Sequence, residues 1–253
     1  MPTTQADPLE PLRADPGSSA VFLDFDGTLS EIVAHPDLAL PVRGAVEALG
    51  SLKAFRSLTL VTGRQAGELR AILGVEIDVE GGYGLAEAVL EDAVAGAREA
   101  AGLVEGSWVE PKGGSVAVHY RAASDPQVAH ERLSAALAPV AERDGLELIE
   151  GKMVLELVPR GASRKGGVVG RILAETGVRH ALYAGDDLPD IEAFDALDRA
   201  VGAGTLVTGV KVAVRGPETP EELVARADLV VEGPGGLVAL LGELSRPGTT
   251  PGA

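Results

Sequence analysis

The sequence contains no cysteine and few aromatic or histidine residues. Without cysteine, a disulfide scaffold, a thiolate zinc site and a cysteine nucleophile are all excluded. The 4 histidines include no pair at the i, i+4 spacing that a helical metal site uses. Because aromatic residues make up only 3% of the chain, we expect a core built from alanine, valine, leucine and isoleucine.

Basic residues are also scarce: 22 Lys+Arg face 38 Asp+Glu, which gives a net charge of −16. This balance argues against non-specific binding to nucleic acid or to an anionic membrane. No apolar run reaches the ~18 residues that a membrane span needs. Residues 1–19 are polar and proline-rich without a signal-peptide core, so we expect a cytoplasmic protein. We predict disordered tails at 1–19 and 246–253.

Strand-like and helix-like segments alternate along most of the chain, which is typical of an α/β fold. Apolar runs predict strands at 20–23, 58–61, 181–184, 211–214 and 228–231. Helical spacing of apolar residues predicts helices at 42–52, 65–73, 165–175, 191–197, 223–227 and 236–244. We therefore predict a doubly wound parallel-sheet core domain made of residues 20–84 and 161–245.

The middle of the chain has a different pattern. Residues 115–120, 146–149 and 153–158 alternate between apolar and polar, as half-buried antiparallel strands do, and residues 126–141 have helical spacing. Gly151 lies between the last two runs, as expected for a hairpin. We predict that residues 85–160 form a smaller α/β domain inserted into the first.

The most informative motif is Val-Phe-Leu-Asp-Phe-Asp-Gly-Thr, in which a buried strand leads directly to Asp24 and Asp26. Ligands of open α/β sheets bind at this end of the strands. Two neighbouring carboxylates repel each other unless a cation is present. Gly27 and Thr28 allow a tight turn whose amides can face an anion. On its own, Asp-x-Asp is a weak signal and is more often a solvated turn.

Three other segments carry matching chemistry. Thr62 and Gly63 follow the second strand, where a hydroxyl and an amide can bind phosphate oxygens. Lys165 begins a helix, where the helix dipole does not favour a cation, so we expect another role for it. Beyond a later strand stands a group of three carboxylates, which offers the oxygen ligands of a hard cation: Asp186, Asp187 and Asp190.

In this order, DFDGT, Thr-Gly, Lys and GDDxxD resemble the four motifs of the haloacid-dehalogenase-like phosphatases. An insert between the second and third motifs is similar to the C2-type cap of that superfamily. A longer set of motifs resembles the trehalose-6-phosphate phosphatase family: FLDFDGTLSEIVAHPDLA, VTGR, SVAVHYR, GKMVLELVPRGASRKG and YAGDDLPDIEAF.

The resemblance implies a Rossmann-like core with a cap and a Mg²⁺-dependent phosphatase that hydrolyses trehalose 6-phosphate through an aspartyl-phosphate. Asp24 would be the nucleophile, Asp26 the general acid and base, and Lys165 a third catalytic residue. The implied phosphate-binding residues are Gly27, Thr28, Thr62, Gly63 and Lys165. The implied Mg²⁺ ligands are Asp24, Asp26 and Asp186, assisted by Asp187 or Asp190. A trehalose-phosphate synthase is the implied pathway partner.

The cap is expected to choose the sugar. Lys152 and Glu156 match a sugar-binding GK-x-x-x-E pattern and share one face if they lie on a strand. Arg121 and Arg64 are the other substrate-binding candidates, and Arg160 and Arg164 are weaker ones. The family's Gly-His-Gly or Glu-His-Gly turn is replaced here by Gly81-Gly82-Tyr83-Gly84, and Pro189 and Ile191 depart from the fourth motif.

Alternative functions stay open at this point. Another sugar phosphate, such as that of sucrose, glucosylglycerol or mannosylglycerate, fits the same four motifs. A catalytically inactive sugar-phosphate sensor would need the same pocket. A receiver domain also surrounds one aspartate with acids, a threonine and a lysine, but it has neither a residue like Asp26 nor a cap.

Overall fold

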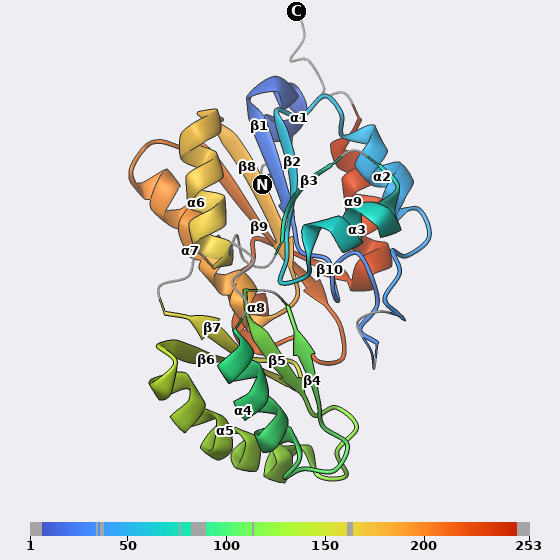
Figure 1. The fold of residues 1–253 in the computed structure, drawn as a ribbon. Helices are drawn as coiled ribbons and strands as arrows, with labels where there is room; N and C mark the ends of the chain where they lie inside the picture. The colour runs from blue at the N-terminus through green and yellow to red at the C-terminus, as the bar shows by residue number, and fades with distance from the viewer. Residues whose placement is uncertain are drawn as a thin grey trace, which may run out of the picture.

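The computed structural model describes residues 7–33, 35, 38–75, 77–81, 90–112, 114–160 and 164–246. Within them, a six-stranded sheet has the order β10-β9-β8-β1-β2-β3, and every pair in it is parallel (Figure 1). The strands are β1 (Ser19–Leu23), β2 (Ser57–Val61), β3 (Asp78–Glu80), β8 (His180–Gly185), β9 (Thr208–Arg215) and β10 (Leu229–Glu232). The chain winds outward in both directions from β1, so the switch point lies between β1 and β8.

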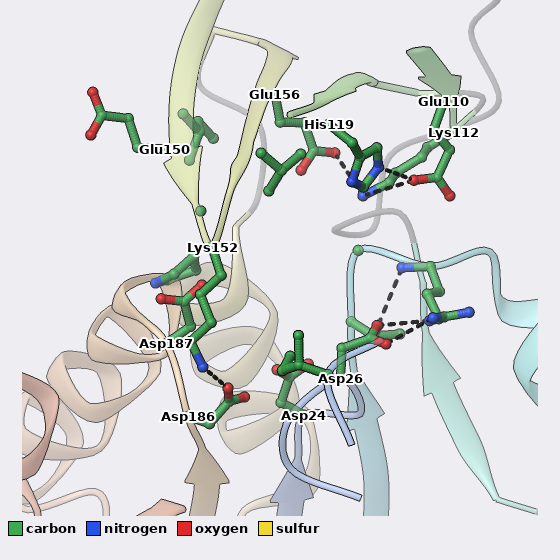
Figure 2. Close-up of a pocket in the computed structure, with 18 of the residues that line it drawn as sticks. Asp24, Asp26, Glu110, Lys112, His119, Glu150, Lys152, Glu156, Asp186 and Asp187 are labelled. Carbon is green, nitrogen blue, oxygen red and sulfur yellow. Dashed lines mark hydrogen bonds and ion pairs between the residues drawn. The ribbon is translucent and has the colours of Figure 1, made fainter. Parts of the chain in front are cut away.

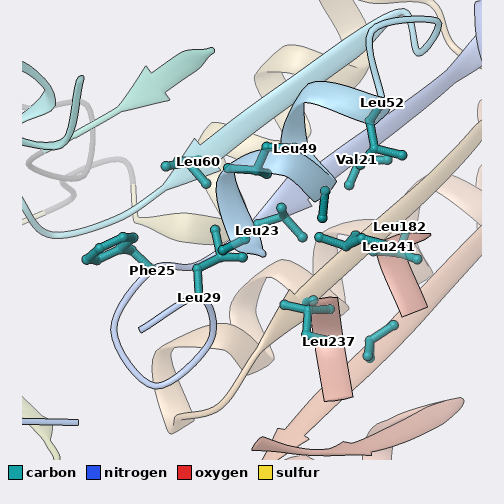
Figure 3. Close-up of a cluster of buried hydrophobic side chains, with 14 of the residues drawn as sticks. Val21, Leu23, Phe25, Leu29, Leu49, Leu52, Leu60, Leu182, Leu237 and Leu241 are labelled. Carbon is teal, nitrogen blue, oxygen red and sulfur yellow. The ribbon is translucent and has the colours of Figure 1, made fainter. Parts of the chain in front are cut away.

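Helices cover both faces of this sheet (Figure 1). One face packs against α2 (Ala45–Ser51), α3 (Ala66–Leu73) and α9 (Gly233–Leu244), and the other against α6 (Lys165–Thr176), α7 (Leu188–Gly202) and α8 (Glu221–Arg226). Because side chains alternate along a strand, Val21 and Leu23 join the first apolar layer (Figure 3), and Ala20 and Phe22 join the second. The predicted doubly wound core is confirmed.

A second sheet belongs to the segment 91–159, which we call the cap. Its strands pair antiparallel in the order β4-β5-β7-β6, and two helices cover its outer face (Figure 1). Its elements are α4 (Glu91–Ala101), β4 (Trp108–Pro111), β5 (Val116–His119), α5 (Pro126–Arg143), β6 (Leu146–Gly151) and β7 (Val154–Pro159). The sequence predicted the last four of these elements but neither α4 nor β4. The boundary at residues 85 and 160 stays a prediction.

The predicted N-terminal disorder is wrong for residues 7–19. Helix α1 (Glu10–Ala14) and the 3₁₀ turn η1 (Pro16–Ser18) lead directly into β1. Leu9 and Leu12 are 4% and 0% exposed and belong to the same apolar layer as Val21. Burial of these leucines offsets the cost of ordering the segment. Residues 1–6 and 247–253 lie outside the described residues.

Among the described residues, none of the helices has both the length and the apolar character that crossing a bilayer requires.

Candidate active site

A pocket lies between the carboxyl ends of the parallel strands and the inner face of the cap (Figure 2). Asp24 follows β1, Thr62 follows β2, Asp186 follows β8, and Lys165 begins α6. Four segments that are distant in sequence thus bring their polar side chains to the switch point of the sheet. Lys165 Nζ lies 3.0 Å from Asp24 Oδ2 and 2.6 Å from Asp190 Oδ1.

Asp24 is buried beside other acids. Its side chain is 9% exposed, and its backbone amide donates to the carbonyl of Ala184 at 2.9 Å, which fixes its position at the strand end. Burial raises the pKa of Asp24 well above its ordinary value; the Lys165 ammonium opposes this shift, while Asp190, Asp186 and Asp26 reinforce it. A carboxylate in this place needs a cation beside it to stay ionised.

The turn after Asp24 is held by hydrogen bonds within the protein. Gly27 has φ 81°, and its amide donates to the carbonyl of Ser30, while the Thr28 amide donates to the carbonyl of Phe25. The Thr28 hydroxyl is buried and donates to Asp186 Oδ1 at 3.0 Å. These donors are engaged within the protein in this structure, and phosphate binding by Gly27 and Thr28 stays a prediction. Thr28 orients Asp186.

Arg64 pairs with a carboxylate of the protein, whereas the sequence predicted that it binds the substrate. Its Nε and Nη2 atoms donate to the two oxygens of Asp26 at 2.7 Å each, and Nη1 lies 3.2 Å from Glu68 Oε1. Such a two-point pair fixes the orientation of a carboxylate. Thr62 and Gly63 line the pocket beside it, as the phosphate-binding prediction requires. Arg64 lines the pocket too, but the structure places its guanidinium on Asp26.

Asp190 is fully buried and receives four hydrogen bonds. Its Oδ2 accepts from the amides of Asp186 and Asp187 at 2.9 Å each, and its Oδ1 accepts from Lys165 Nζ and the Tyr183 hydroxyl at 2.6 Å each. The Asp187 side chain caps α7 by accepting from the amide of Leu188 at 2.8 Å. Both side chains therefore stabilise the conformation of this loop through their hydrogen bonds.

The carboxylates fit a hard divalent cation. One oxygen each of Asp24, Asp186 and Asp190 lie within 4.8 Å of one another. Burial raises the pKa of Asp186 to about 7, although the Lys152 ammonium counteracts this. Oxygen donors without sulfur or imidazole are the ligands that Mg²⁺ prefers. Because four donors already surround Asp190, Asp24 and Asp186 are the better direct ligands.

The cap places Lys152 and Glu156 at the pocket, and their binding of the sugar stays a prediction (Figure 2). Lys152 lies in the β6–β7 turn rather than on a strand, and its ammonium reaches across to Asp186 Oδ2. Glu156 is 5% exposed and accepts from the Ser115 hydroxyl at 2.5 Å. Glu156 is thus a buried, oriented acceptor at the pocket wall rather than part of a wet sheet face.

Arg121 lines the same pocket, and its guanidinium connects the cap to the core. Nη1 and Nη2 lie 2.5 and 2.9 Å from the carboxylate oxygens of Glu218, and Nη2 donates to the carbonyl of Lys152 at 3.2 Å. The weaker candidates have other partners: Arg160 Nε donates to the carbonyl of Leu146 at 2.9 Å, and Arg164 pairs with Glu147 and Glu192. Tyr83 lies outside the described residues.

Sequence reasoning missed four polar residues of the cap that line the pocket: Glu110, Lys112, His119 and Glu150 (Figure 2). His119 Nε2 lies 2.7 Å from Glu110 Oε2, and Lys112 Nζ lies 3.7 Å from Glu156 Oε1. The His119 ring stacks on Trp108 at 4.1 Å between centroids. The polar residues at 110 and 112 were the available signal, because residues two apart on a strand share a face.

Comparison with known structures identifies the fold. The C-terminal domain of a Candida albicans trehalose-6-phosphate phosphatase matches with a TM-score of 0.77 at 20% identity, covering 93% of this chain and 96% of that one. A haloacid dehalogenase-like hydrolase from Bacteroides thetaiotaomicron matches with a TM-score of 0.58 at 15% identity, covering 89% and 99%. The parallel core and the inserted cap are those of the haloacid-dehalogenase-like fold.

The family model described as trehalose-phosphatase matches residues 86–222, more than half of the chain. A trehalose-phosphate phosphatase from Mycobacterium ulcerans is 34% identical over 249 residues, which cover 89% of this chain and 61% of that protein. The chain therefore belongs to the trehalose-phosphatase family. It spans about three fifths of the length of that relative.

Proposed function

We propose that this protein hydrolyses trehalose 6-phosphate to trehalose and phosphate, using Asp24 as nucleophile. The observation that carries the proposal is the position of Lys165 Nζ, 3.0 Å from Asp24 at the end of β1 and beneath the cap. Membership of the trehalose-phosphatase family supports the choice of sugar. The substrate would be supplied by a synthase that makes trehalose phosphate.

In the first half-reaction, an oxygen of Asp24 attacks phosphorus and the bond from phosphorus to the sugar oxygen breaks. The leaving oxygen takes a proton from Asp26, because a sugar alkoxide is a poor leaving group. Lys165, Thr62 and Gly63 bind the phosphoryl oxygens and stabilise the charge that develops on them. The product of this half-reaction is an aspartyl-phosphate and free sugar.

In the second half-reaction, water attacks the phosphorus of the aspartyl-phosphate, and Asp26 accepts its proton. The Arg64 guanidinium donates to both oxygens of Asp26 and so orients the carboxylate for this step. Proton donation in the first half requires this pair to open. Asp24, Asp186 and the backbone carbonyl of Asp26 would hold Mg²⁺, which neutralises charge on the phosphoryl oxygens when bound.

The pocket wall opposite the catalytic acids would bind the sugar. Glu156, Glu110 and Lys112 present acceptors and a donor to the pocket and hold one another in place. Polar groups fixed in this way hydrogen-bond sugar hydroxyls without a further loss of side-chain entropy. Lys112 also brings positive charge toward an anionic substrate, although the chain as a whole carries −16.

The direct test is phosphate release from a panel of sugar phosphates, with Mg²⁺ and with a chelator. We expect turnover only with Mg²⁺, and the highest kcat/KM with trehalose 6-phosphate. A higher kcat/KM with the phosphate of sucrose, glucosylglycerol or mannosylglycerate would contradict the choice of sugar. No release from any of them after Mg²⁺ is restored would favour a sugar-phosphate sensor.

Replacing Glu156 with alanine tests the cap assignment. Loss of a buried acceptor is expected to lower kcat/KM for the sugar phosphate, mainly through KM. The corresponding loss of transition-state stabilisation is ~1–3 kcal/mol. Turnover of p-nitrophenyl phosphate, which has no sugar, is expected to stay at the wild-type rate. The matched control is Glu142→Ala, because Glu142 is exposed on α5. Equal kcat/KM in the two variants would remove Glu156 from the substrate site.

A further inference from the structure

The hydroxyl of Tyr183 has no role in the chemistry described so far. Tyr183 is fully buried between the sheet and α6 and α7, where it packs edge-on against Phe194 with 6.1 Å between ring centroids. A phenylalanine would fill the same volume, so packing alone does not require the hydroxyl. A buried hydroxyl costs free energy unless it is hydrogen-bonded. Here it donates to Asp190 Oδ1 at 2.6 Å.

That oxygen is shared between two donors. Lys165 Nζ donates to Asp190 Oδ1 at 2.6 Å, and the same ammonium lies 3.0 Å from Asp24 Oδ2. The other oxygen of Asp190 is held by the amides of Asp186 and Asp187. The carboxylate of Asp190 therefore connects the lysine, the loop that carries Asp186, and the rigid ring of Tyr183.

We propose that Tyr183 is a positioning residue for phosphoryl transfer: its hydroxyl fixes Asp190 Oδ1 and so keeps the Lys165 ammonium against Asp24. This inference rests on the proposed function. Without the hydroxyl, Lys165 is the side-chain donor that remains on Asp190 Oδ1 among the described residues. Their ion pair then tightens in a site of low dielectric. The ammonium then moves toward Asp190 and away from the oxygen that attacks phosphorus.

Loss of the Tyr183 hydroxyl is expected to weaken stabilisation of the transition state rather than binding of the sugar. Lys165 stabilises charge that develops on the phosphoryl oxygens, so a misplaced ammonium lowers kcat. The groups proposed to hold the sugar lie on the cap, so KM is expected to change little. An orthovanadate ion, which mimics the transferring phosphoryl group, should lose affinity together with kcat.

The test is Tyr183→Phe, with kcat, KM, the inhibition constant of orthovanadate and Tm measured on the full chain with Mg²⁺. Loss of a hydrogen bond to a carboxylate is expected to lower kcat about ten- to a hundredfold and to raise the vanadate constant by a similar factor. KM is expected to stay within about twofold.

The matched control is Phe194→Leu, which weakens the same apolar layer and removes no hydrogen bond. It is expected to lower Tm while kcat and the vanadate constant stay at wild-type values. If Tyr183→Phe lowers only Tm, or raises KM at constant kcat, the positioning role is overturned. Wild-type turnover of the sugar phosphates is measured first, so failure of the proposed function is seen separately.

Discussion

Asp24→Asn is expected to abolish phosphate release, because an amide cannot attack phosphorus. The remaining groups, Lys165, Asp26 and Asp186, still surround the phosphoryl position, so substrate binding is expected to survive. The measurements are single-turnover phosphate release and calorimetric binding of substrate to the variant. Asp198→Asn is the control, because Asp198 is half-exposed and pairs with Lys211 at 2.8 Å, away from the pocket. Turnover by Asp24→Asn near the control rate would exclude Asp24 as nucleophile.

The same variant is expected to be at least as stable as the wild type when a chelator is present. Burial raises the pKa of Asp24, so the folded state binds a proton more tightly than the unfolded state does. Such a group stabilises the fold below its ordinary pKa, about 4, and this contribution is lost as pH rises. An uncharged amide avoids that loss. The difference in Tm between variant and wild type should therefore grow from acidic to neutral pH.

The convergence of the proposed catalytic groups was predictable because it follows from topology. Parallel strands end at one edge of a sheet, so residues that directly follow buried apolar runs must meet there. Asp24, Thr62 and Asp186 each follow such a run, and Lys165 begins a helix that packs on the same sheet. No other information than the order of strands and helices was needed to place them together.

Side-chain partners were not predictable in this way. Arg64 pairs with Asp26, Thr28 with Asp186, and Arg121 with Glu218, which is 97 positions away in sequence. Each pair depends on which rotamer the surrounding packing permits and on how the cap sits on the core. A sequence motif can give a residue type at a site, but it does not give the direction in which the side chain points.

The short elements β4 and α1 were missed for a related reason. Strand β4 lies at the edge of the cap sheet, is only half-buried and ends at Pro111, so its apolar pattern is weak. Helix α1 has one fully buried residue, Leu12, in a proline-rich segment. In both cases tertiary burial stabilises a segment whose local sequence has little preference. Glu110, which β4 carries into the pocket, was missed together with its strand.

Asp26→Asn is expected to slow turnover and to trap the aspartyl-phosphate. An asparagine neither protonates the leaving sugar nor deprotonates water, and general acid–base catalysis contributes typically ~10²–10⁴-fold. Hydrolysis of the intermediate should suffer most, because water must lose a proton to attack. Mass spectrometry of the variant quenched during turnover should detect one phosphoryl group on the peptide that contains Asp24.

A matched control for this experiment comes from the second ion-pair partner of Arg64. Arg64 binds Asp26 on one side and Glu68 on the other, and the Glu68 side chain is 44% exposed. Glu68→Gln also replaces a carboxylate partner of Arg64 with an amide, but this partner lies away from the reacting atoms. Turnover is therefore expected to stay near that of the wild type. If Asp26→Asn instead turns over as fast as Glu68→Gln and no phosphorylated peptide appears, then Asp26 only anchors Arg64, and the proton must be transferred by another group.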